Sequence, residues 1–516
     1  MLVARRSVLA RFTSSQRFFA APALDFDNSE AACRGMTTGE VARAWFVLRV
    51  CGLPGVVKHS RALYENSRKF FGDNITDAFL KATFFGHFCG GETAEEVRET
   101  AHRLRKSGIG TIVDYAAEAD IDAAEGKTDM SESDALSRLY DANTDLFIEC
   151  VDTAAQAACD DANAIFAAVK VTALASPAAL MEGSAAINAA RELFCKLSGG
   201  MNEELAVEVF KQKVTFPDEL VGELVDHFFG DSETIEYVDW KARIDVTELE
   251  NYPSAVRKFL ADRQIEVSDE VVHALNVCRQ RAARVAHHAK EKNVRVFVDA
   301  EQSQFQPAID AVTQSLMAEF NTESPVVYST HQAYLQRTRG SLQQDMLRAR
   351  KQNYHFATKL VRGAYLEWER SQGSSYHAPC VSLQQTHQQY DECAALVCQE
   401  IVERKGKASL MLATHNKESL QKIVTLAKET SATLGQVGAS QHIFTAQLLG
   451  MADALTAAVA QEGSLSVYKY VPYGPIHEVL PYLLRRIAEN GDVVTGGAAA
   501  QAQLLQRELL RRMTPL

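Results

Sequence analysis

Residues 356–365 read FATKLVRGAY, and this stretch decides the fold. Its first six residues, Phe356 to Val361, are mostly apolar or β-branched and have the length of a single strand. The residues that follow place a cation, a glycine and an aromatic side chain directly behind that strand. A polar segment at a strand end is typical of the active face of an α/β barrel, where catalytic side chains follow the strands.

Six further runs of this kind lie along the chain, separated by longer helical patterns. They are Ile165 to Val171, Val294 to Val298, Val326 to Ser329, Leu410 to Ala413, His442 to Phe444 and Ser466 to Tyr470. Seven strands alternating with helices, with an eighth only weakly marked, predict an α/β fold of the (β/α)8 barrel type.

The regions around these runs differ in character. Residues 25–162 are predicted to form a mostly helical N-terminal region, with its clearest helix from Glu92 to Lys106 behind a capping-box pattern. The barrel is expected over residues 163–512. About 120 residues separate its first run from its second, which is far more than one βα unit needs. Residues from about 180 to 285 are therefore expected to be a helical insertion.

Residues 1–24 carry four arginines, several hydroxyl side chains and no acidic residue. This composition is typical of a mitochondrial transit peptide, and a disordered basic tail is the alternative. The longest uncharged stretch, Thr430 to Ala452, contains glycines, glutamines and a histidine, so it is too polar to span a bilayer.

The composition of the 516-residue chain fits a globular enzyme, with 47% apolar and 23% charged residues. A formal net charge of −12 excludes a generally basic surface for nucleic acid. Ten scattered cysteines without a C-x-x-C pair indicate a reducing compartment. No metal-binding pattern, phosphate loop or Rossmann glycine motif is present, so no metal site is expected.

Polar residues recur where the predicted strands end. Lys170, Asp299, Lys359 and the tetrapeptide ATHN at 413–416 each close or follow an apolar run. Taken singly, each is more often a solvated or helix-capping group. Because barrel enzymes assemble their sites from several strand ends, the recurrence favours a catalytic face.

After the last run, residues 482–490 read YLLRRIAEN. Tyr482 precedes Arg485 and Arg486 by three and four residues, so the three side chains can share one helical face. Spacing alone favours a simpler interpretation, which is a surface helix whose Arg485 pairs with Glu489.

Together these segments resemble the proline dehydrogenase family. The shared motifs are KLVRGAY at 359–365, ATHN at 413–416, QLLGMxD at 447–453 and YxxRRxxEN at 482–490, with a further match from Phe84 to Glu118. The resemblance covers roughly residues 75–510 outside the predicted insertion. Several linked motifs in the right order make an accidental match improbable.

The resemblance implies a distorted (β/α)8 barrel whose last helix lies over the carboxyl end, with FAD along that end and L-proline against the flavin. The implied catalytic and substrate-binding residues are Lys170, Asp299, Tyr470, Tyr482, Arg485 and Arg486, with Tyr365 and Leu448 packing against the substrate ring. Two arginines suit the substrate carboxylate, because their bidentate geometry is one that lysine cannot supply.

The residues that the resemblance implies for FAD binding are Gln332, Lys359, Val361, Arg362, Gly363, Thr414, His415, Asn416 and Glu489. Lys359 takes the position beside flavin N5, where bacterial members usually have arginine, so it marks the eukaryotic branch. Glu118 is implied to pair with Arg485 as a gate. The stretch from Thr386 to Tyr390 departs from the family pattern, which leaves the adenine-end contacts open.

The implied activity is oxidation of L-proline to 1-pyrroline-5-carboxylate, with hydride passing from C5 to FAD N5 and electrons going on to ubiquinone. This first step of proline catabolism implies a location in the mitochondrion, on the matrix side and peripherally on the inner membrane. The alternatives are a hydroxyproline dehydrogenase of the same family and a non-catalytic barrel scaffold. Tyr482 favours unsubstituted proline, because its hydroxyl would crowd a 4-hydroxyl group. The oligomeric state stays open.

Overall fold

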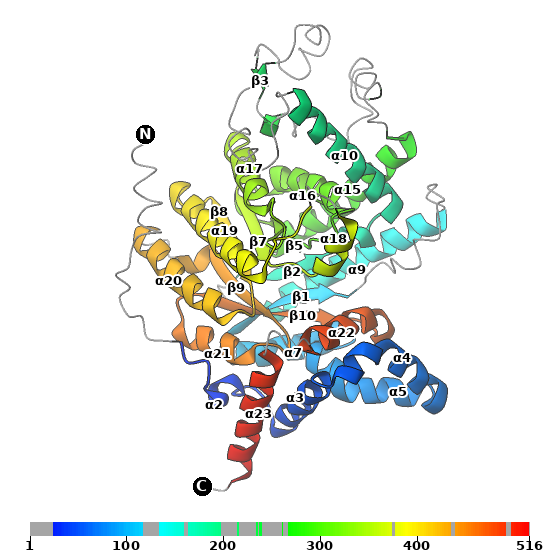
Figure 1. Cartoon of the computed structure of the whole chain (residues 1–516), viewed down its shortest axis with the longest axis vertical. Helices are drawn as coiled ribbons and strands as arrows, with labels where there is room; N and C mark the ends of the chain where they lie inside the picture. Colours follow the sequence, from blue (N-terminus) through cyan, green and yellow to red (C-terminus); the bar gives the residue numbers. More distant parts are fainter. Residues whose placement is uncertain are drawn as a thin grey trace.

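The computed structural model describes residues 24–116, 134–158, 164–197, 267–373, 377–434, 439–491 and 497–514, with a few positions between 214 and 261. Within them, eight parallel strands close into a barrel in the order β1-β10-β9-β8-β7-β6-β5-β2 (Figure 1). The strands are β1 (Ile109–Tyr115), β2 (Phe166–Val169), β5 (Arg295–Val298), β6 (Val327–Gln332), β7 (Phe356–Val361), β8 (Ala408–Ala413), β9 (Ile443–Leu448) and β10 (Ser466–Tyr473). The predicted barrel is confirmed, and all seven predicted runs are strands.

Strand β1 corrects the expected start of the barrel. We expected a mostly helical region over 25–162 and a barrel from residue 163, yet β1 pairs with both β10 and β2 and closes the ring. Its sequence, IGTIVDY, lacks the continuous apolar run of the other strands because Gly110 and Thr111 interrupt it. The glycine is required there, since a Cβ would lie 2.4 Å from the Tyr468 ring.

Helices cover the outer wall of the barrel (Figure 1). They are α9 (Asp134–Ala158), α10 (Pro177–Leu197), α15 (Asp269–Glu291), α16 (Gln306–Phe320), α17 (Thr338–Lys351), α19 (Leu383–Glu403), α20 (Lys417–Leu434) and α21 (Asp453–Glu462). Their apolar faces and the outward side chains of the strands form the main core. In the described part of the chain, no helix combines the length and apolar character needed to cross a membrane.

The predicted insertion is narrower than 180–285. Its two ends belong to α10 and α15, which pack against each other and against α16. Between these helices, the structure describes only a short antiparallel pair, β3 (Val214–Thr215) with β4 (Thr234–Ile235), and a few isolated positions. The helical character expected for the middle of this segment falls mostly outside the described residues, as does nearly all of the predicted transit peptide at 1–24.

The last helix, α22 (Ile476–Gly491), leaves the ring of outer helices. Its place against β10 and β1 is taken by α7 (Ala94–Arg105), which begins with the predicted capping box. Helix α22 instead packs with α3 (Thr38–Cys51), α4 (Pro54–Phe71) and the π-helix η1 (Lys81–Phe85) (Figure 1). We call the apolar cluster at this junction the N-terminal core; it includes Val47, Phe84, Phe88, Val479, Tyr482 and Leu483.

Aromatic rings fill the part of the barrel interior that lies toward the amino-terminal ends of the strands. Phe166 and Phe297 stack with their centroids 4.8 Å apart, and the Tyr468 ring meets Phe166 edge-on at 5.1 Å. Tyr328 and Phe444 complete this group of five rings, which we call the aromatic layer. Because the aromatic layer fills the interior beneath them, the carboxyl ends of the strands are where a ligand can bind inside the barrel.

Candidate active site

Two buried ion pairs lie at the carboxyl ends of the strands, one layer above the aromatic rings. Lys170, directly after β2, donates to both carboxylate oxygens of Asp114 on β1, at 2.8 and 3.0 Å. Lys359 on β7 pairs with Asp299, which directly follows β5. The Asp114 and Lys359 side chains are only 2% and 8% exposed. Because burying charges is costly even when they are paired, this arrangement suits chemistry better than stability.

Tyr470 on β10 joins these pairs into one network, which we call the charged layer. Its hydroxyl donates to Asp299 Oδ2 at 2.8 Å. Burial by itself raises the pKa of Asp299, but Lys359 and Lys170 more than offset it and hold that pKa below its usual range. Burial, together with Asp114 and Asp299, raises the pKa of Tyr470, so its hydroxyl stays protonated. The layer therefore presents two carboxylates, two lysines and a phenolic donor.

The structure brings together four residues that the sequence predicted, Lys170, Asp299, Lys359 and Tyr470. It adds Asp114, which lay within the amino-terminal match but was given no role. The signal for Asp114 was its position near the end of β1, equivalent to that of Asp299 after β5. That signal was lost because β1 was not recognised as a strand.

Helix α22 brings the arginine pair to the same end of the barrel. Tyr482 and Arg486 are buried, and the Arg486 guanidinium lies 4.7 Å from the centre of the Tyr482 ring. Arg486 pairs with Glu489, and one face of the helix is buried, so the simple surface helix suggested by spacing is wrong. Burial raises the pKa of Tyr482. The Tyr115 hydroxyl, one residue after Asp114, donates to Glu478 at 2.8 Å and so ties α22 to the end of β1.

Two polar atoms on α22 are buried without a partner. The Tyr482 hydroxyl and Arg486 Nε have no hydrogen-bond partner among the residues that the structure describes. Buried polar atoms are normally satisfied, so each such exception needs an explanation. A bound ligand with hydrogen-bonding groups at this position would satisfy both atoms.

Arg362, just after β7, is held by neutral side chains. Its Nε donates to His387 Nδ1 at 2.9 Å, and its terminal nitrogens donate to Thr414 Oγ1 at 2.7 Å and Ser419 Oγ at 2.9 Å. The guanidinium also lies 4.3 Å from the centre of the Tyr390 ring. Burial lowers the pKa of Arg362 without removing its charge. A guanidinium fixed by neutral partners keeps that charge for an anionic ligand such as a diphosphate.

Gly363 and Gln332 meet around Tyr334. Gly363 has φ +129°, and a Cβ there would lie 1.4 Å from the Tyr334 ring, so only glycine fits. Gln332 donates from Nε2 to the Glu301 carbonyl oxygen at 2.9 Å and accepts from the Tyr334 hydroxyl at 3.2 Å. Both residues therefore have internal structural roles, and their contact with FAD stays a prediction.

The ATHN segment contributes both to the candidate site and to the start of a helix. Thr414 accepts from Arg362, as described above. Asn416 Oδ1 accepts from the Ser419 N–H at 2.8 Å and caps α20, as the alternative interpretation expected. His415 Nε2 accepts from the Leu448 N–H at 3.1 Å, which links the ends of β8 and β9.

The remaining predicted residues lie at the same end of the barrel, except for one. Val361 ends β7, and Tyr365 precedes α18 (Leu366–Gln372). Leu448 ends β9 in register with Tyr470 of β10. Glu118, the predicted gate, lies outside the described residues.

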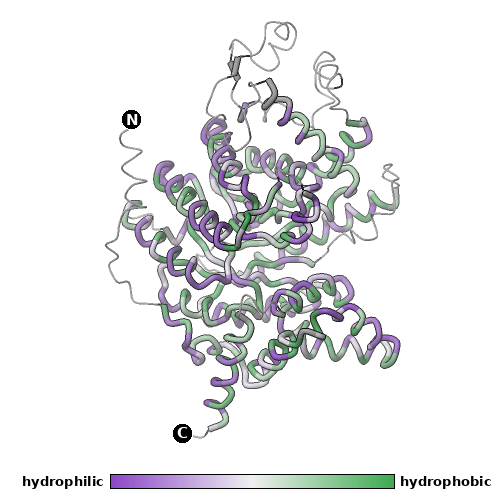
Figure 2. The backbone as a smooth tube through the Cα atoms, viewed as in Figure 1, coloured by the Kyte–Doolittle hydropathy of each residue, from purple (hydrophilic) through white to green (hydrophobic). Residues whose placement is uncertain are grey.

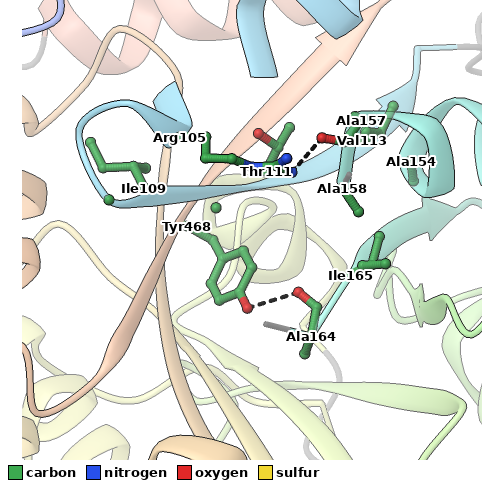
Figure 3. A pocket seen from close by; sticks show the side chains of 12 residues that line it. Arg105, Ile109, Thr111, Val113, Ala154, Ala157, Ala158, Ala164, Ile165 and Tyr468 are labelled. Atoms are coloured by element: carbon green, nitrogen blue, oxygen red, sulfur yellow. Dashed lines mark hydrogen bonds between the residues drawn. The ribbon is translucent and has the colours of Figure 1, made fainter. Parts of the chain in front are cut away.

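A separate cavity of about 90 Å³ opens at the opposite end of the barrel (Figure 3). Its walls include Ile109 and Ile165, at the beginnings of β1 and β2. The Tyr468 hydroxyl donates to the Ala164 carbonyl oxygen at 2.8 Å there, and Arg105 donates to the Ala157 carbonyl oxygen. Polar groups paired in this way, at the amino-terminal face, indicate a role in stability.

Comparison with known proteins agrees with this geometry. The profile of the family described as Proline dehydrogenase matches residues 97–496. The chain belongs to the proline dehydrogenase family. The predictions of family membership and of an enzyme are thus confirmed.

Named relatives of this family member fall into two groups. It is 32% identical over 557 aligned positions to "Proline dehydrogenase 1, mitochondrial" of Caenorhabditis elegans, over 95% of this chain and 89% of the relative. It is also 32% identical over 487 positions to "Hydroxyproline dehydrogenase" of Rattus norvegicus, over 92% of each chain. Equal identity to both groups leaves the substrate to be argued from the site.

A solved structure shares the fold. It is proline utilization A from Bdellovibrio bacteriovorus, inactivated by N-propargylglycine, with a TM-score of 0.56 at 17% sequence identity. The match covers 100% of this chain and 44% of that longer one. At this identity the likeness supports the barrel architecture alone.

Proposed function

We propose that this family member oxidises L-proline to 1-pyrroline-5-carboxylate, with hydride passing from C5 of the substrate ring to N5 of bound FAD. The observation that carries the proposal is that Tyr482 Oη and Arg486 Nε are buried without a hydrogen-bond partner among the described residues, on a helix that the Tyr115–Glu478 hydrogen bond ties to the end of β1. A small ring bearing a carboxylate matches this combination of cations, aromatic walls and free donors.

The residues at the strand ends fit FAD. Arg362 offers a fixed guanidinium for the diphosphate, and Thr414 belongs to the set that holds it. Lys359, in the second half of β7, is the cation expected beside N5, and Gln332 and Glu489 are proposed for the pyrimidine edge and the adenosine side. When bound, FAD supplies the two-electron acceptor that takes up the hydride.

The protein's own part in the reaction is to bind, orient and exclude water. Arg485 and Arg486 hold the substrate carboxylate from α22, and Lys170 adds a third positive contact from the barrel. Tyr365, Leu448 and the ring of Tyr482 pack against the proline ring and select its size. Fixing the ring in this way gives C5 one orientation for transfer.

The reaction requires the substrate in one protonation state. The nitrogen lone pair forms the C=N bond as hydride leaves C5, so proline must react with a neutral ring nitrogen. The remaining N–H proton then leaves to give the neutral imine. Asp299 and Tyr470 position Lys359 and need not exchange protons, because the lowered pKa of Asp299 keeps it ionised.

Tyr482 supports proline over 4-hydroxyproline as the substrate. Its ring is packed in the N-terminal core beneath α22, so its hydroxyl has little freedom to move aside for a 4-hydroxyl group. Hydroxyproline oxidation is the second candidate, because a relative with that name is also 32% identical to this chain.

The proposed location is the mitochondrion, which agrees with the word in the relatives' names. We further propose that the protein is attached to the matrix side of the inner membrane and that ubiquinone is its electron acceptor. The arginine-rich composition of residues 1–24 supports import.

The deciding experiment is the absorption spectrum of the purified protein, followed by addition of L-proline without air. A flavin spectrum that bleaches with proline and not with 4-hydroxyproline is the expected result. Bleaching with 4-hydroxyproline alone would keep the fold and change the substrate. A colourless protein that cannot be reconstituted with FAD would overturn the proposal in favour of a non-catalytic scaffold.

A further inference from the structure

Large apolar side chains are exposed on two helices next to the barrel, α4 (Pro54–Phe71) and α5 (Asp73–Leu80). Phe70 and Phe71 are 82% and 63% exposed. The exposed apolar residues of this segment are Leu53, Leu63, Phe70, Phe71, Ile75 and Phe79. Single exposed apolar residues are common, but a group of six on one pair of helices indicates a binding surface.

The turn between the two helices forms a tip that carries Phe70 and Phe71, with Ile75 and Phe79 on the helix that follows, whereas Leu53 and Leu63 lie farther back along α4. The helices meet at Gly72, whose φ of +78° allows the sharp turn directly after Phe70 and Phe71. Ile75 and Phe79 are four residues apart on α5 and share a face. The first turn of α4 carries Val56 and Val57, which pack on the N-terminal core. Figures 1 and 2 show both helices at the margin of the molecule, with hydrophobic and hydrophilic residues interspersed.

The charge of this segment differs from that of the whole chain. Residues 53–81 contain five lysines and arginines and three acidic residues, whereas the chain carries a formal charge of −12. Lys58 and Lys69 are exposed on the same helix as the two phenylalanines, and the exposed Arg68 pairs with Asp73. Phenylalanine and leucine beside basic side chains on an amphipathic helix is the pattern of a segment that lies in a membrane interface.

We infer that the α4–α5 pair, from Leu53 to Lys81, is the surface that docks this protein on an anionic lipid bilayer. The apolar residues at the tip enter the headgroup region, and the basic residues contact lipid phosphates. A second copy of the chain is a poorer occupant, because a buried protein interface is usually depleted in lysine.

The surface lies directly behind the active-site helix. Helix α4 packs against α22, which carries Tyr482, Arg485 and Arg486. Docking at α4–α5 therefore holds the substrate and flavin end of the barrel near the bilayer, where a lipid-soluble quinone is found. Its biological purpose rests on the proposed function, but binding to lipid can be measured without it.

The test is co-sedimentation of the full chain with vesicles of phosphatidylcholine, with and without phosphatidylglycerol. We expect binding that needs the anionic lipid. Phe70→Glu/Phe71→Glu should lower it by about tenfold or more, because each change removes buried apolar area and adds a repelled charge. The matched control is Leu510→Glu/Met513→Glu, the same change at two exposed residues of α23 (Gly497–Met513), which should bind as the wild type does.

A second measurement separates this inference from the proposed function. Proline oxidation with a water-soluble dye should be equal in wild type and Phe70→Glu/Phe71→Glu, whereas oxidation with quinone in the vesicles should fall in the variant alone. Failure of the dye assay in the wild type would count against the proposed function and leave the vesicle result standing. Three outcomes would overturn the inference: no wild-type binding to anionic vesicles, equal loss in the α23 control, or a change from dimer to monomer as the only effect of the tip substitutions.

Discussion

The aromatic layer and the charged layer share two strands, β5 and β10, and their contributions to the two layers are two residues apart. Phe297 on β5 is followed by Asp299, and Tyr468 on β10 is followed by Tyr470, whose hydroxyl binds Asp299. Inward positions change from rings to charges within one layer of about 7 Å along the strands. This difference shows that the two layers have different roles within one closed barrel. The aromatic layer packs the interior, and the charged layer keeps paired charges available for a ligand.

The largest expected effect is the loss of stability from a change in the aromatic layer. Phe166 contacts four other rings of the aromatic layer, so Phe166→Ala should lower the free energy of unfolding by about 4 kcal/mol. The activity per folded molecule should stay within about twofold at low temperature, because no charged-layer residue is lost. Chemical denaturation followed by circular dichroism measures the first quantity. Phe166→Leu, which keeps most of the volume, should recover most of the stability; if activity fell as steeply as stability, the two layers would not be separable.

The arginine pair should show the reverse pattern. Arg485→Met or Arg486→Met removes one charge-assisted contact to the substrate carboxylate, so each should cost about 3 kcal/mol in transition-state stabilisation. Steady-state kinetics with proline and a soluble dye measures this loss as kcat/KM. Arg485→Lys keeps the charge and should lose less than Arg485→Met, since only the bidentate geometry is gone. A value of kcat/KM close to that of the wild type in both Met variants would remove these residues from the substrate site.

Asp299→Asn should affect activity and stability together, and a double variant separates them. The change leaves Lys359 buried without its carboxylate, so we expect about 2 kcal/mol loss in kcat/KM and a lower thermal midpoint. Asp299→Asn/Lys359→Met replaces both charges with neutral side chains. It should regain the thermal midpoint while activity stays low, because the cation proposed beside flavin N5 is gone and Lys170 remains as the only lysine of the charged layer. A double variant that regains activity would make the ion pair a structural feature only.

Tyr482→Phe should have a smaller effect that concerns selectivity. The tyrosine hydroxyl is buried without a partner in the described residues, so its removal should leave the midpoint unchanged or slightly higher. The preference for proline over 4-hydroxyproline should fall by about tenfold, since the group that crowds the extra hydroxyl is gone. Competing both substrates in one assay measures the ratio directly; an unchanged ratio would place the origin of selectivity elsewhere.

The charged layer was largely predictable because each of its residues follows a local pattern. Lys170 and Asp299 follow runs that are recognisable as strands and Lys359 lies in the second half of another, and parallel strands bring their carboxyl ends together. Asp114 was missed, since close packing against Tyr468 demands a glycine that breaks the run in β1. The sequence of β1 alone does not reveal that the Tyr468 ring of the neighbouring strand β10 packs against it.

Contacts between distant elements were the least predictable part of the site. Two of the three hydrogen-bond partners of Arg362, His387 and Ser419, come from α19 and from the start of α20, in helical phases that no local pattern connects to β7. The burial of α22 depends on α3 and α4, so spacing alone indicated a surface helix. Only the family resemblance assigned Arg485 and Arg486 to the substrate.

The pH dependence of activity should be insensitive to the charged layer, and this is the smallest expected effect. The pKa of Asp299 is lowered in the folded protein, so its carboxylate is ionised at every pH above about 4. Its contribution to stability is therefore present above the unfolded-state pKa and is lost only as the pH falls through the lower folded-state pKa. Between about pH 6 and 9, kcat/KM should rise with pH solely because the substrate amine loses its proton. Asp299→Asn should lower the whole profile without moving its inflection. A shift of more than about half a pH unit would assign the titrating group to the charged layer instead of to proline.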